Sequence, residues 1–515
     1  MKKNIINKDI LVIPFLLAFG ILINQYYGNQ GAFPHDSFAH FETGYRIING
    51  EHPFKDYWII SGPLVDYIQS LFFLLLGVNF QIYVLHASIF NGILTVLVFL
   101  FFRQFEMDKI YCIIYAIFFS ILAYPSSGTP FVDHHSAFFS LIAVLFAILA
   151  INKGNKYFWI LSPVFLICAF FSKQVPAFYV TIPLVLILII YFYKEKEVKP
   201  FVLTSASLII FTLFVLFLGF INGITFTSFF DQYISYPQTI GQSRFQNLKN
   251  ISIFGIIGNF KFILILKVLL ILIFFKKKLF NKKNLYYFLI IFSFTLALIF
   301  HQILTRNQIF IFFLIPLLGG FIHIYYLKEK KLYQYLMILF CLFVTIKYHY
   351  RFNEGRKFHE LINANFELSI NAEVISKSLS GLRWITPQHL NDPEAEIKVI
   401  LENKEILLKD ERKKMVLSNY PFLSVILEED FFSPTRWHVF DGTDYPQIGN
   451  KFYLRYQEML LNLLKINKIE VIYTIDPING DIIYNYIDQN CFEEKKITNN
   501  LKRFLIKKCK LLNYN

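Results

Sequence analysis

The run PLVDYIQSLFFLLLG, residues 63–77, decides the topology of this chain, because counting it as a membrane span reverses the side of every later segment. It has only fifteen residues, whereas a helix needs about 20 apolar residues to cross the hydrocarbon core. Asp66, Gln69 and Ser70 also lie in its first half. We therefore predict a helix that lies in the outer membrane interface and does not span the bilayer.

The other apolar runs are each close to the span length of about 20 residues, and we interpret all of them as spans. The first follows Lys2, Lys3 and Lys8 and is expected to stay uncleaved, because no small-residue cleavage site follows it. The predicted spans are eleven: 9–27, 81–102, 110–124, 136–151, 157–172, 175–193, 200–221, 256–275, 285–304, 308–327 and 332–347.

The sidedness of the loops follows from their basic residues. Without 63–77 in the count, the short lysine and arginine clusters between spans all fall on the N-terminal side, which the positive-inside rule identifies as cytoplasmic. If residues 63–77 were counted as a span, every one of these basic clusters would lie on the outer side of the membrane. The segments predicted on the outer face are 28–62, 125–135, 222–255 and the tail after Tyr348.

Composition supports a membrane protein. The chain is 55% hydrophobic and only 17% charged, with a mean hydropathy of +0.47. Its net charge of +14 lies in the loop clusters, so we expect no nucleic-acid partner. The predicted fold is a polytopic α-helical membrane protein: residues 1–348 form about 11 transmembrane helices with external juxtamembrane helices, and residues 349–515 form an external soluble α/β domain.

The α/β prediction for the tail rests on alternating patterns after residue 351. Helical periodicity covers 450–466, and strand-like runs cover 414–418, 437–440 and 470–475. The tail also carries Trp384, Arg436, Trp437, His438 and Asp441, a polar and aromatic group typical of carbohydrate contact, although core packing explains Trp437 equally well. Of the five cysteines, only Cys491 and Cys509 are candidates for pairing.

The first external loop begins with FPHDSFAHFE, residues 33–42. Asp36 lies a few residues past the first span, where burial beside lipid favours proton uptake and makes a carboxylate a usable base near neutral pH. Glu42 and Asp56 follow as candidates for binding substrate. The alternative is structural: Asp36 or Ser37 caps a helix that begins near Phe38.

The second external loop ends in VDHHS, with Asp133 and His134 directly before a span. Together with His35 and Asp36 these side chains offer metal ligands. However, neighbouring residues on a helix point about 100° apart, so His134 and His135 are poorly placed to hold one ion. We therefore expect no metal cofactor, with a divalent ion as the minor alternative, and the competing interpretation is that Asp133 caps the helix and the histidines lie in the interface.

Four further polar residues lie at the outer ends of predicted spans. A cation at such a boundary can reach the aqueous phase without any function. Cations at the same depth as two carboxylate loops, however, also suit a lipid phosphate, which arginine binds as a fork and lysine as a point charge. The candidates for substrate binding are Lys173, Gln174, His301 and Arg306.

These segments resemble the GT-C superfamily of membrane glycosyltransferases, particularly the protein O-mannosyltransferases and the aminoarabinose transferases that act on lipid A. The resemblance rests on Asp36 after the first span, then GYRIINGEHPFKDYW and SGPLVDYIQSLFFLLLG, and later VDHHSAFFSL, KQVPAF and RNQIFIFFLIPLLGG. It covers roughly residues 1–345. Ser37 stands where the family usually has a second acidic residue, which leaves Asp36 as the single candidate base.

The resemblance implies transfer of one hexose or pentose from a polyprenyl-phosphate donor to a glycan, lipid or protein acceptor on the outer face of the membrane. In that role Asp36 deprotonates the acceptor hydroxyl, Asp133 faces the same cavity, and Lys173 and Arg306 hold the departing lipid phosphate. The expected location is a bacterial inner membrane with the C-terminal domain in the periplasm, in the synthesis of cell-envelope glycans or glycolipids.

Two other functions compete with this one. A transporter or flippase for an envelope lipid or polysaccharide usually shows related halves and polar residues at mid-membrane, whereas here the polar groups gather on one face. A polysaccharide polymerase or ligase also acts outward from the membrane, and the loop pattern discriminates against it only weakly.

Overall fold

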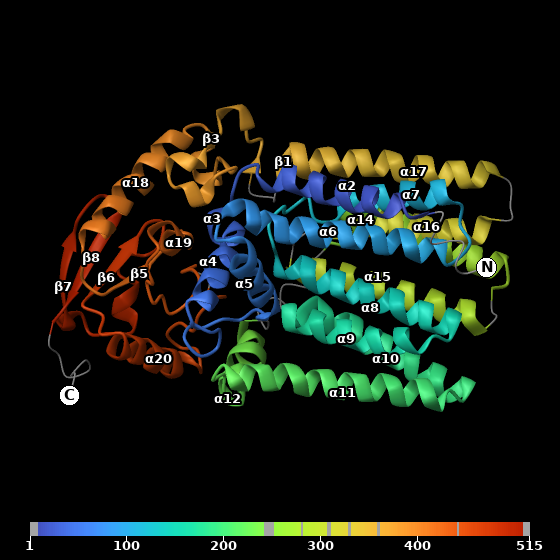
Figure 1. Cartoon of the computed structure of the whole chain (residues 1–515), viewed down its shortest axis with the longest axis horizontal. Coiled ribbons are helices and arrows are strands. Elements are labelled where there is room, and N and C mark those ends of the chain that lie inside the picture. Colours follow the sequence, from blue (N-terminus) through green and yellow to red (C-terminus); the bar gives the residue numbers. More distant parts are fainter. Residues whose placement is uncertain are drawn as a thin grey trace. The chain divides into compact units, whose positions relative to one another are not determined.

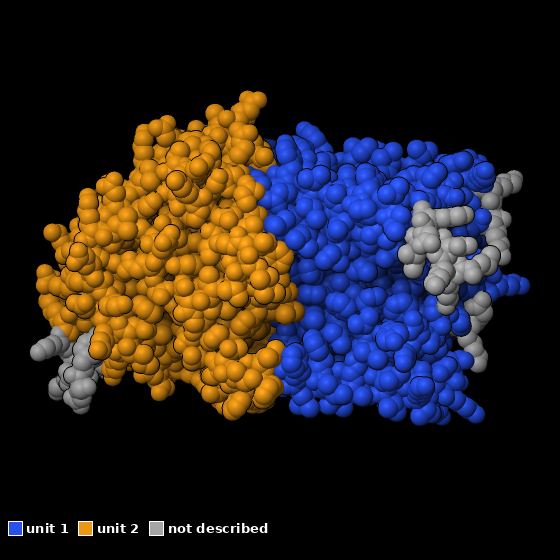
Figure 2. All heavy atoms as spheres, viewed as in Figure 1, with its two compact units in different colours: residues 1–29, 84–216, 244–363 blue, residues 30–83, 217–243, 364–515 orange. Residues whose placement is uncertain are grey.

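The computed structural model describes residues 9–240, 252–279, 282–305, 311–327, 331–357, 361–439 and 442–507. Its chain forms two compact units, each built from segments far apart in the sequence (Figure 2). Unit 1 comprises residues 1–29, 84–216 and 244–363, and unit 2 comprises residues 30–83, 217–243 and 364–515.

Apolar helices occur at every predicted span, within the described residues, and those of unit 1 lie side by side in Figure 1. They are α2 Val12–Gly28, α6 Phe80–Arg103, α7 Lys109–Leu122, α8 Val132–Lys153, α9 Lys156–Ser172, α10 Gln174–Glu195, α11 Val198–Ile221, α14 Ile253–Lys276, α15 Lys282–Thr305, α16 Leu314–Tyr326 and α17 Lys331–His349. Seven described helices are long and apolar enough to cross a membrane: α6, α8, α10, α11, α14, α15 and α17. The chain is therefore an integral membrane protein, and its predicted fold class is confirmed.

The helices differ sharply in how much of their surface is covered. Almost every residue of α8 is buried, whereas α11 has no buried residue at all. An apolar helix that is buried all round is central to its bundle, and one that exposes apolar side chains all round suits lipid contact. The central helix α8 begins with Val132 and Asp133, so the second predicted external loop leads directly into the middle of unit 1.

A close backbone approach fixes that loop. Gly128 has a φ of +74°, and a Cβ there would lie 2.4 Å from the Cα of Gly28 at the end of α2. Asn24 of α2 also donates its side-chain amide to the Gly128 carbonyl at 3.0 Å. Only glycine permits both the backbone angle and the approach.

Unit 2 contains short helices from the first predicted external loop and most of the tail. Its elements are α3 Pro34–Ser37, α4 Ala39–Ile48, α5 Leu64–Leu76, α12 Phe226–Phe229, the π-helix η1 Phe230–Ser235, β3 Ile370–Asn371, β4 Arg383–Trp384, α18 Pro393–Lys409, β5 Lys414–Leu417, α19 Leu423–Leu427, α20 Tyr453–Ile466, β6 Val471–Ile475, β7 Phe492–Lys496 and β8 Leu501–Ile506, with short 3-10 turns η4 to η9 between residues 366 and 491. The tail residues before 364 group with unit 1, as the π-helix η3 Tyr350–Glu354 and the hairpin of β1 Arg356–Lys357 and β2 Leu361–Ile362. The predicted domain boundary after residue 348 stays a prediction.

A four-stranded sheet in the order β5-β6-β8-β7 forms the tail's core. β5 and β6 are parallel, with Lys414 opposite Val471, and the other pairs are antiparallel. Met415, Ile472 and Phe504 of the sheet pack with Tyr456 and Leu464 of α20 in one hydrophobic cluster. The predicted α/β character of the tail follows from this layer of helix on sheet.

One predicted strand is absent: residues 437–439 are irregular, and Phe440 lies outside the described residues. The reason is that side chains take the hydrogen bonds that a strand would use. The Trp437 amide donates to Asp444 at 3.4 Å, and the His438 amide donates to the side chain of Asn419 at 2.8 Å.

Three separate segments build unit 2 into one body. The Trp58 amide donates to the Pro434 carbonyl at 2.7 Å, and the Tyr236 hydroxyl donates to the Gly442 carbonyl at 2.6 Å. Trp58 and Tyr236 also belong to the hydrophobic cluster of the sheet. Segments that the sequence predicts on the same side of the membrane thus share a single core.

The helix α5, from the run that decides the topology, has two unlike faces. Its buried face consists of Val65, Asp66, Gln69, Ser70 and Phe73. The exposed face carries leucines that are 51 to 73% exposed: Leu71, Leu74, Leu75 and Leu76. A short helix with a leucine face on one side fits the predicted position in the membrane interface.

Candidate functional site

Three of the predicted substrate-binding residues meet in unit 1. The Lys173 ammonium donates to Oδ2 of Asp133 at 2.5 Å, and Nε2 of His301 lies 2.7 Å from Oδ1 of the same carboxylate. Because a carboxylate paired with an ammonium only accepts, His301 is the donor of that bond. Both oxygens of Asp133 are therefore occupied by donors from two different elements.

The three side chains come from helix ends. Asp133 lies in the first turn of α8, His301 in the last turns of α15, and Lys173 in the extended link between α9 and α10, where its φ is −160°. The Ser136 hydroxyl donates to the Lys173 carbonyl at 3.1 Å and fixes that link against α8. Since α8 begins where α9 and α15 end, the alternation of spans places this cluster at one end of the bundle.

The cluster is buried except for its lysine. The side chain of His301 is 1% exposed and that of Asp133 is 7% exposed, whereas Lys173 remains 23% exposed. An ammonium has three N–H donors, and Asp133 takes one of them in the described contacts. Lys173 is thus held in place by Asp133 while part of it stays accessible to an anion.

The capping interpretation of Asp133 is wrong. α8 begins at Val132, its N-cap is Phe131, and no side chain caps it. The carboxylate is used instead by Lys173 and His301, which lie 40 and 168 residues away in sequence. Sequence spacing near a helix start therefore does not distinguish a local cap from a tertiary contact.

The two adjacent histidines are buried and both contact Tyr124, one through its ring face and the other through its hydroxyl. His134 stacks on Tyr124 with ring centroids 4.7 Å apart, whereas His135 lies 2.5 Å from the Tyr124 hydroxyl and 3.0 Å from Nε2 of His86. Both are fully covered within unit 1, and their predicted depth at the membrane interface stays a prediction. Among the described residues, no group of three or more His, Cys, Asp or Glu is placed to hold a metal ion.

The described contacts of Asp133, Lys173 and His301 with one another include none of the other candidates. Gln174 is half-buried at the start of α10. Asp56 of unit 2 accepts the His52 amide at 2.7 Å and lies 3.5 Å from Lys55, so it closes a local turn. Arg306 lies outside the described residues, and its proposed contact with phosphate stays a prediction.

The predicted base Asp36 is half-buried on the four-residue helix α3 of unit 2. It does not cap the next helix: the N-cap of α4 is Phe38, without a side-chain cap, and the Ser37 hydroxyl accepts the Phe33 amide at 3.0 Å. The charge of Asp36 acts on His40, one turn further along the chain. The capping alternative for Asp36 and Ser37 is therefore wrong, and the role of Asp36 as a base stays a prediction.

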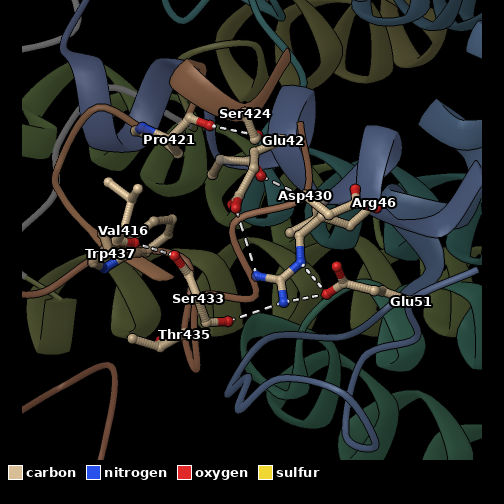
Figure 3. A network of polar contacts seen from close by, with 12 residues as sticks. Glu42, Arg46, Glu51, Val416, Pro421, Ser424, Asp430, Ser433, Thr435 and Trp437 are labelled. Atoms are coloured by element: carbon tan, nitrogen blue, oxygen red, sulfur yellow. Dashed lines mark hydrogen bonds and ion pairs between the residues drawn. The ribbon is translucent and has the colours of Figure 1, made fainter. Parts of the chain in front are cut away.

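Glu42 belongs to a buried network around Arg46 (Figure 3). The guanidinium of Arg46 lies 3.5 Å from Glu42 and donates to Glu51 at 2.5 and 2.8 Å. It also donates to the Ser433 carbonyl at 2.9 Å and lies over the Tyr57 ring at 4.0 Å. Arg46 thus ties the first loop to the tail through its Nε and Nη2, whereas its Nη1 lies 3.5 Å from Glu42 without a hydrogen bond among the described residues.

A second carboxylate is buried nearby on α5. Asp66 accepts from Nδ1 of His40 and from the Thr43 hydroxyl, each at 2.5 Å. Burial alone favours the neutral acid, but His40 and these hydrogen bonds hold the pKa of Asp66 below its usual value. Burial also lowers the pKa of His40, so the pair is a neutral imidazole that donates to a carboxylate.

Burial gives Glu42 a pH-dependent effect on stability. It raises the pKa of Glu42 from 4.5 to about 8, against the opposing charge of Arg46. Between these values the folded carboxyl keeps a proton that the unfolded one has released, so rising pH destabilises the fold. We expect Glu42→Gln, which cannot ionise, to flatten the fall of the thermal midpoint between about pH 5 and pH 8.

Thermal unfolding in detergent across that pH range measures the effect. The matched control is Glu394→Gln, because Glu394 is 66% exposed and pairs with its helix neighbour Lys398. The control should keep the wild-type slope. An unchanged slope in Glu42→Gln would show that the buried carboxyl does not take up a proton on folding.

No protein-family model matches the sequence, and no curated protein matches it. Among solved structures, the chain is similar to ArnT from Cupriavidus metallidurans bound to undecaprenyl phosphate, with 8% identity, a TM-score of 0.47 and coverage of 96% of this chain and 97% of that chain. It is also similar to an oligosaccharyltransferase from Archaeoglobus fulgidus in complex with zinc and sulfate, with 12% identity, a TM-score of 0.42 and coverage of 89% and 68%. These likenesses are too weak to show a family. We therefore argue the function from the residues of this chain.

Sequence reasoning gave no role to three residues of the buried polar region, Arg46, His40 and Asp66, and it named Arg436 only as part of a polar and aromatic group in the tail. Each is polar and nearly covered, with 0 to 4% exposure. The available signal was the position of Arg46 and Asp66 in the same loop as Asp36, and the unusual RWH triplet at 436–438. Cys491 is disulfide-bonded, whereas Cys509, its candidate partner from the sequence, lies outside the described residues.

Proposed function

We propose that this protein is a membrane glycosyltransferase that moves one sugar, a hexose or a pentose, from a polyprenyl-phosphate donor to an acceptor at the outer face of the membrane. The proposal places it in a bacterial inner membrane with the tail in the periplasm, in cell-envelope synthesis. The observation that carries the proposal is the Asp133–Lys173–His301 cluster. A partly exposed ammonium, held at one end of an apolar bundle, suits the phosphate of a lipid whose chain lies among the helices.

The proposed chemistry is a direct displacement. The carboxylate of Asp36 takes the proton of the acceptor hydroxyl, and the acceptor oxygen attacks the anomeric carbon. The bond from that carbon to the phosphate oxygen breaks, and the lipid phosphate leaves with the electron pair, which inverts the configuration. Lys173, with Arg306, stabilises the charge that develops on the phosphate.

Each partner of Lys173 has a separate proposed part. Asp133 fixes the position of the ammonium, and His301 occupies the other oxygen of Asp133, so that this carboxylate does not turn away from the lysine. A charged group that is already oriented does not have to reorganise as the reaction proceeds. Asp133 and His301 are thus proposed as positioning residues.

The test is an assay with purified protein in lipid nanodiscs. Lipid-linked sugars extracted from the producing cells are added with an envelope fraction as acceptor source, and the release of free polyprenyl phosphate is measured. We expect release that depends on both the extract and the acceptor fraction. Movement of intact donor across the bilayer of a liposome, without release of the sugar, would replace the transferase with a flippase.

A further inference from the structure

Arg436 in unit 2 is a buried cation with unused hydrogen-bonding capacity. Its side chain is 4% exposed, and its Nη2 donates to the Ser61 hydroxyl. Its Nε and Nη1 have no hydrogen-bond partner among the described residues. A guanidinium has five N–H donors, and burying them without acceptors costs free energy.

Arg46, in the same unit, provides the contrast. Both arginines are nearly covered, at 3 and 4% exposure. Arg46 has carboxylate partners in Glu42 and Glu51, as well as a carbonyl acceptor. No carboxylate of the described residues lies within ion-pair distance of Arg436. Both arginines have an Nη1 without a hydrogen bond among the described residues, but Arg46 has counter-charges, whereas Arg436 has none and also leaves its Nε open.

The carboxyl groups near Arg436 each have one oxygen in contact with another residue, and their second oxygens, Oδ2 of Asp66 and Oε2 of Glu42, have no hydrogen-bond partner among the described residues. The charge of Arg436 acts on Glu42 and Asp66, but Asp66 is held by His40 and Thr43, and Glu42 faces Arg46. The nearby Tyr57 hydroxyl, also buried, has no partner among the described residues. The surroundings of Arg436 are therefore polar, yet no carboxylate among these groups forms an ion pair with its guanidinium.

An aromatic ring connects Arg436 to the helix of the proposed base. The guanidinium carbon lies 4.6 Å from the ring centroid of Trp437, and the ring centroid of His35 lies 6.2 Å from that of Trp437. His35 directly precedes Asp36 on α3. Trp437 is half-buried, so its ring offers a surface on which a sugar can stack.

We propose that Arg436 binds an oxyanion of a substrate, a carboxylate or a phosphate, beside the helix that carries Asp36. The planar fork of an arginine matches both groups in a bidentate manner. Ser61 positions the fork through Nη2, and Trp437 supports its face. This inference rests on the proposed function, because it takes the ligand to be a substrate of the transfer reaction. It adds that this substrate carries a negatively charged group, which binds close to the proposed base Asp36.

Ligand protection of the purified, full-length protein tests the binding without needing any transfer. The thermal midpoint is measured at constant ionic strength with three probes: undecaprenyl phosphate, glucuronate and inorganic phosphate. We expect at least one probe to raise the midpoint of the wild type, and Arg436→Gln to lose that rise. Protection by undecaprenyl phosphate alone assigns the site to the donor, and protection by glucuronate assigns it to an acidic sugar.

The variants distinguish binding from folding. Arg412→Gln is the matched control, because Arg412 is a surface arginine of the same unit that pairs with Asp410 at 2.7 Å, and it should keep the full rise. Arg436→Lys keeps the charge but loses the fork, so it should keep part of the rise. If Arg436→Gln does not fold, Ser61→Ala and Arg436→Lys give the comparison.

The outcomes for the binding site and for the transferase are separable. The oxyanion site is overturned, whatever the transfer assay shows, if a probe protects Arg436→Gln as strongly as the wild type. It is also overturned if no probe protects the wild type. Protection that depends on Arg436, in a protein that releases no lipid phosphate, overturns the transferase alone. If the protein transfers sugar, Arg436→Lys should raise the KM for the substrate whose probe gives protection. The fold-increase in this KM should be at least ten times the fold-increase in the KM for the other substrate.

Discussion

Asp36→Asn is expected to lower sugar transfer by about 10²- to 10⁴-fold, which is the contribution that a positioned general base makes. The amide keeps the size and the hydrogen-bonding shape of the carboxyl group but cannot take the proton of the acceptor hydroxyl. Insertion and folding should be unchanged, because Asp36 does not cap α3 or α4. Transfer is measured as the release of polyprenyl phosphate by purified protein.

The control for this variant is Glu405→Gln. Glu405 belongs to unit 2, is 71% exposed and pairs with Lys409, four residues along its own helix. It should transfer at the wild-type rate. Near-normal transfer by Asp36→Asn, at equal amounts of folded protein, would remove Asp36 from the role of base.

The second large effect is expected at Lys173. Lys173→Gln leaves the Asp133 carboxylate in its buried position without its cation, and losing one partner of a buried ion pair typically costs about 3 to 5 kcal/mol of stability. Because Lys173 is 23% exposed, we expect the lower end of that range, about 3 kcal/mol. Transfer should fall as well, through a higher KM for the lipid donor.

The double variant Asp133→Asn and Lys173→Gln distinguishes structure from function. It replaces the charged pair with neutral groups of similar size, so the thermal midpoint should recover towards that of the wild type. Transfer should stay low, since no ammonium remains for the phosphate. Recovery of transfer together with stability would mean that Lys173 serves only as an ion pair.

The sequence predicted the helices of the bundle because hydrophobic length is a local property. The rejection of 63–77 as a span is supported by α5, with 13 residues and one polar buried face. The Trp437 strand was wrong because Asp444 and Asn419 compete for the amides of 437 and 438, and such side-chain partners do not appear in a local pattern.

The candidate site was predictable only in part. The alternation of the spans predicts that Asp133, Lys173 and His301 lie at the same depth, which is why all three were candidates. It does not predict the direction in which each side chain points from its helix. The bonds among them join residues 40 and 168 positions apart. The open guanidinium of Arg436 could not be predicted, because it depends on which carboxylates Arg46 and His40 have already taken.

Unit 2 is built from segments far apart in the sequence, so it cannot be complete until late in synthesis. Arg46 bonds to a residue 387 positions downstream, which a ribosome adding about 5 to 20 residues per second reaches roughly 20 to 80 s later. During that interval the first loop exists without the tail that covers its charged side chains. The nascent loop therefore needs water, lipid headgroups or a chaperone as a temporary partner, and synthesis of the segment around Ser433 is the event that gives Arg46 its backbone acceptor.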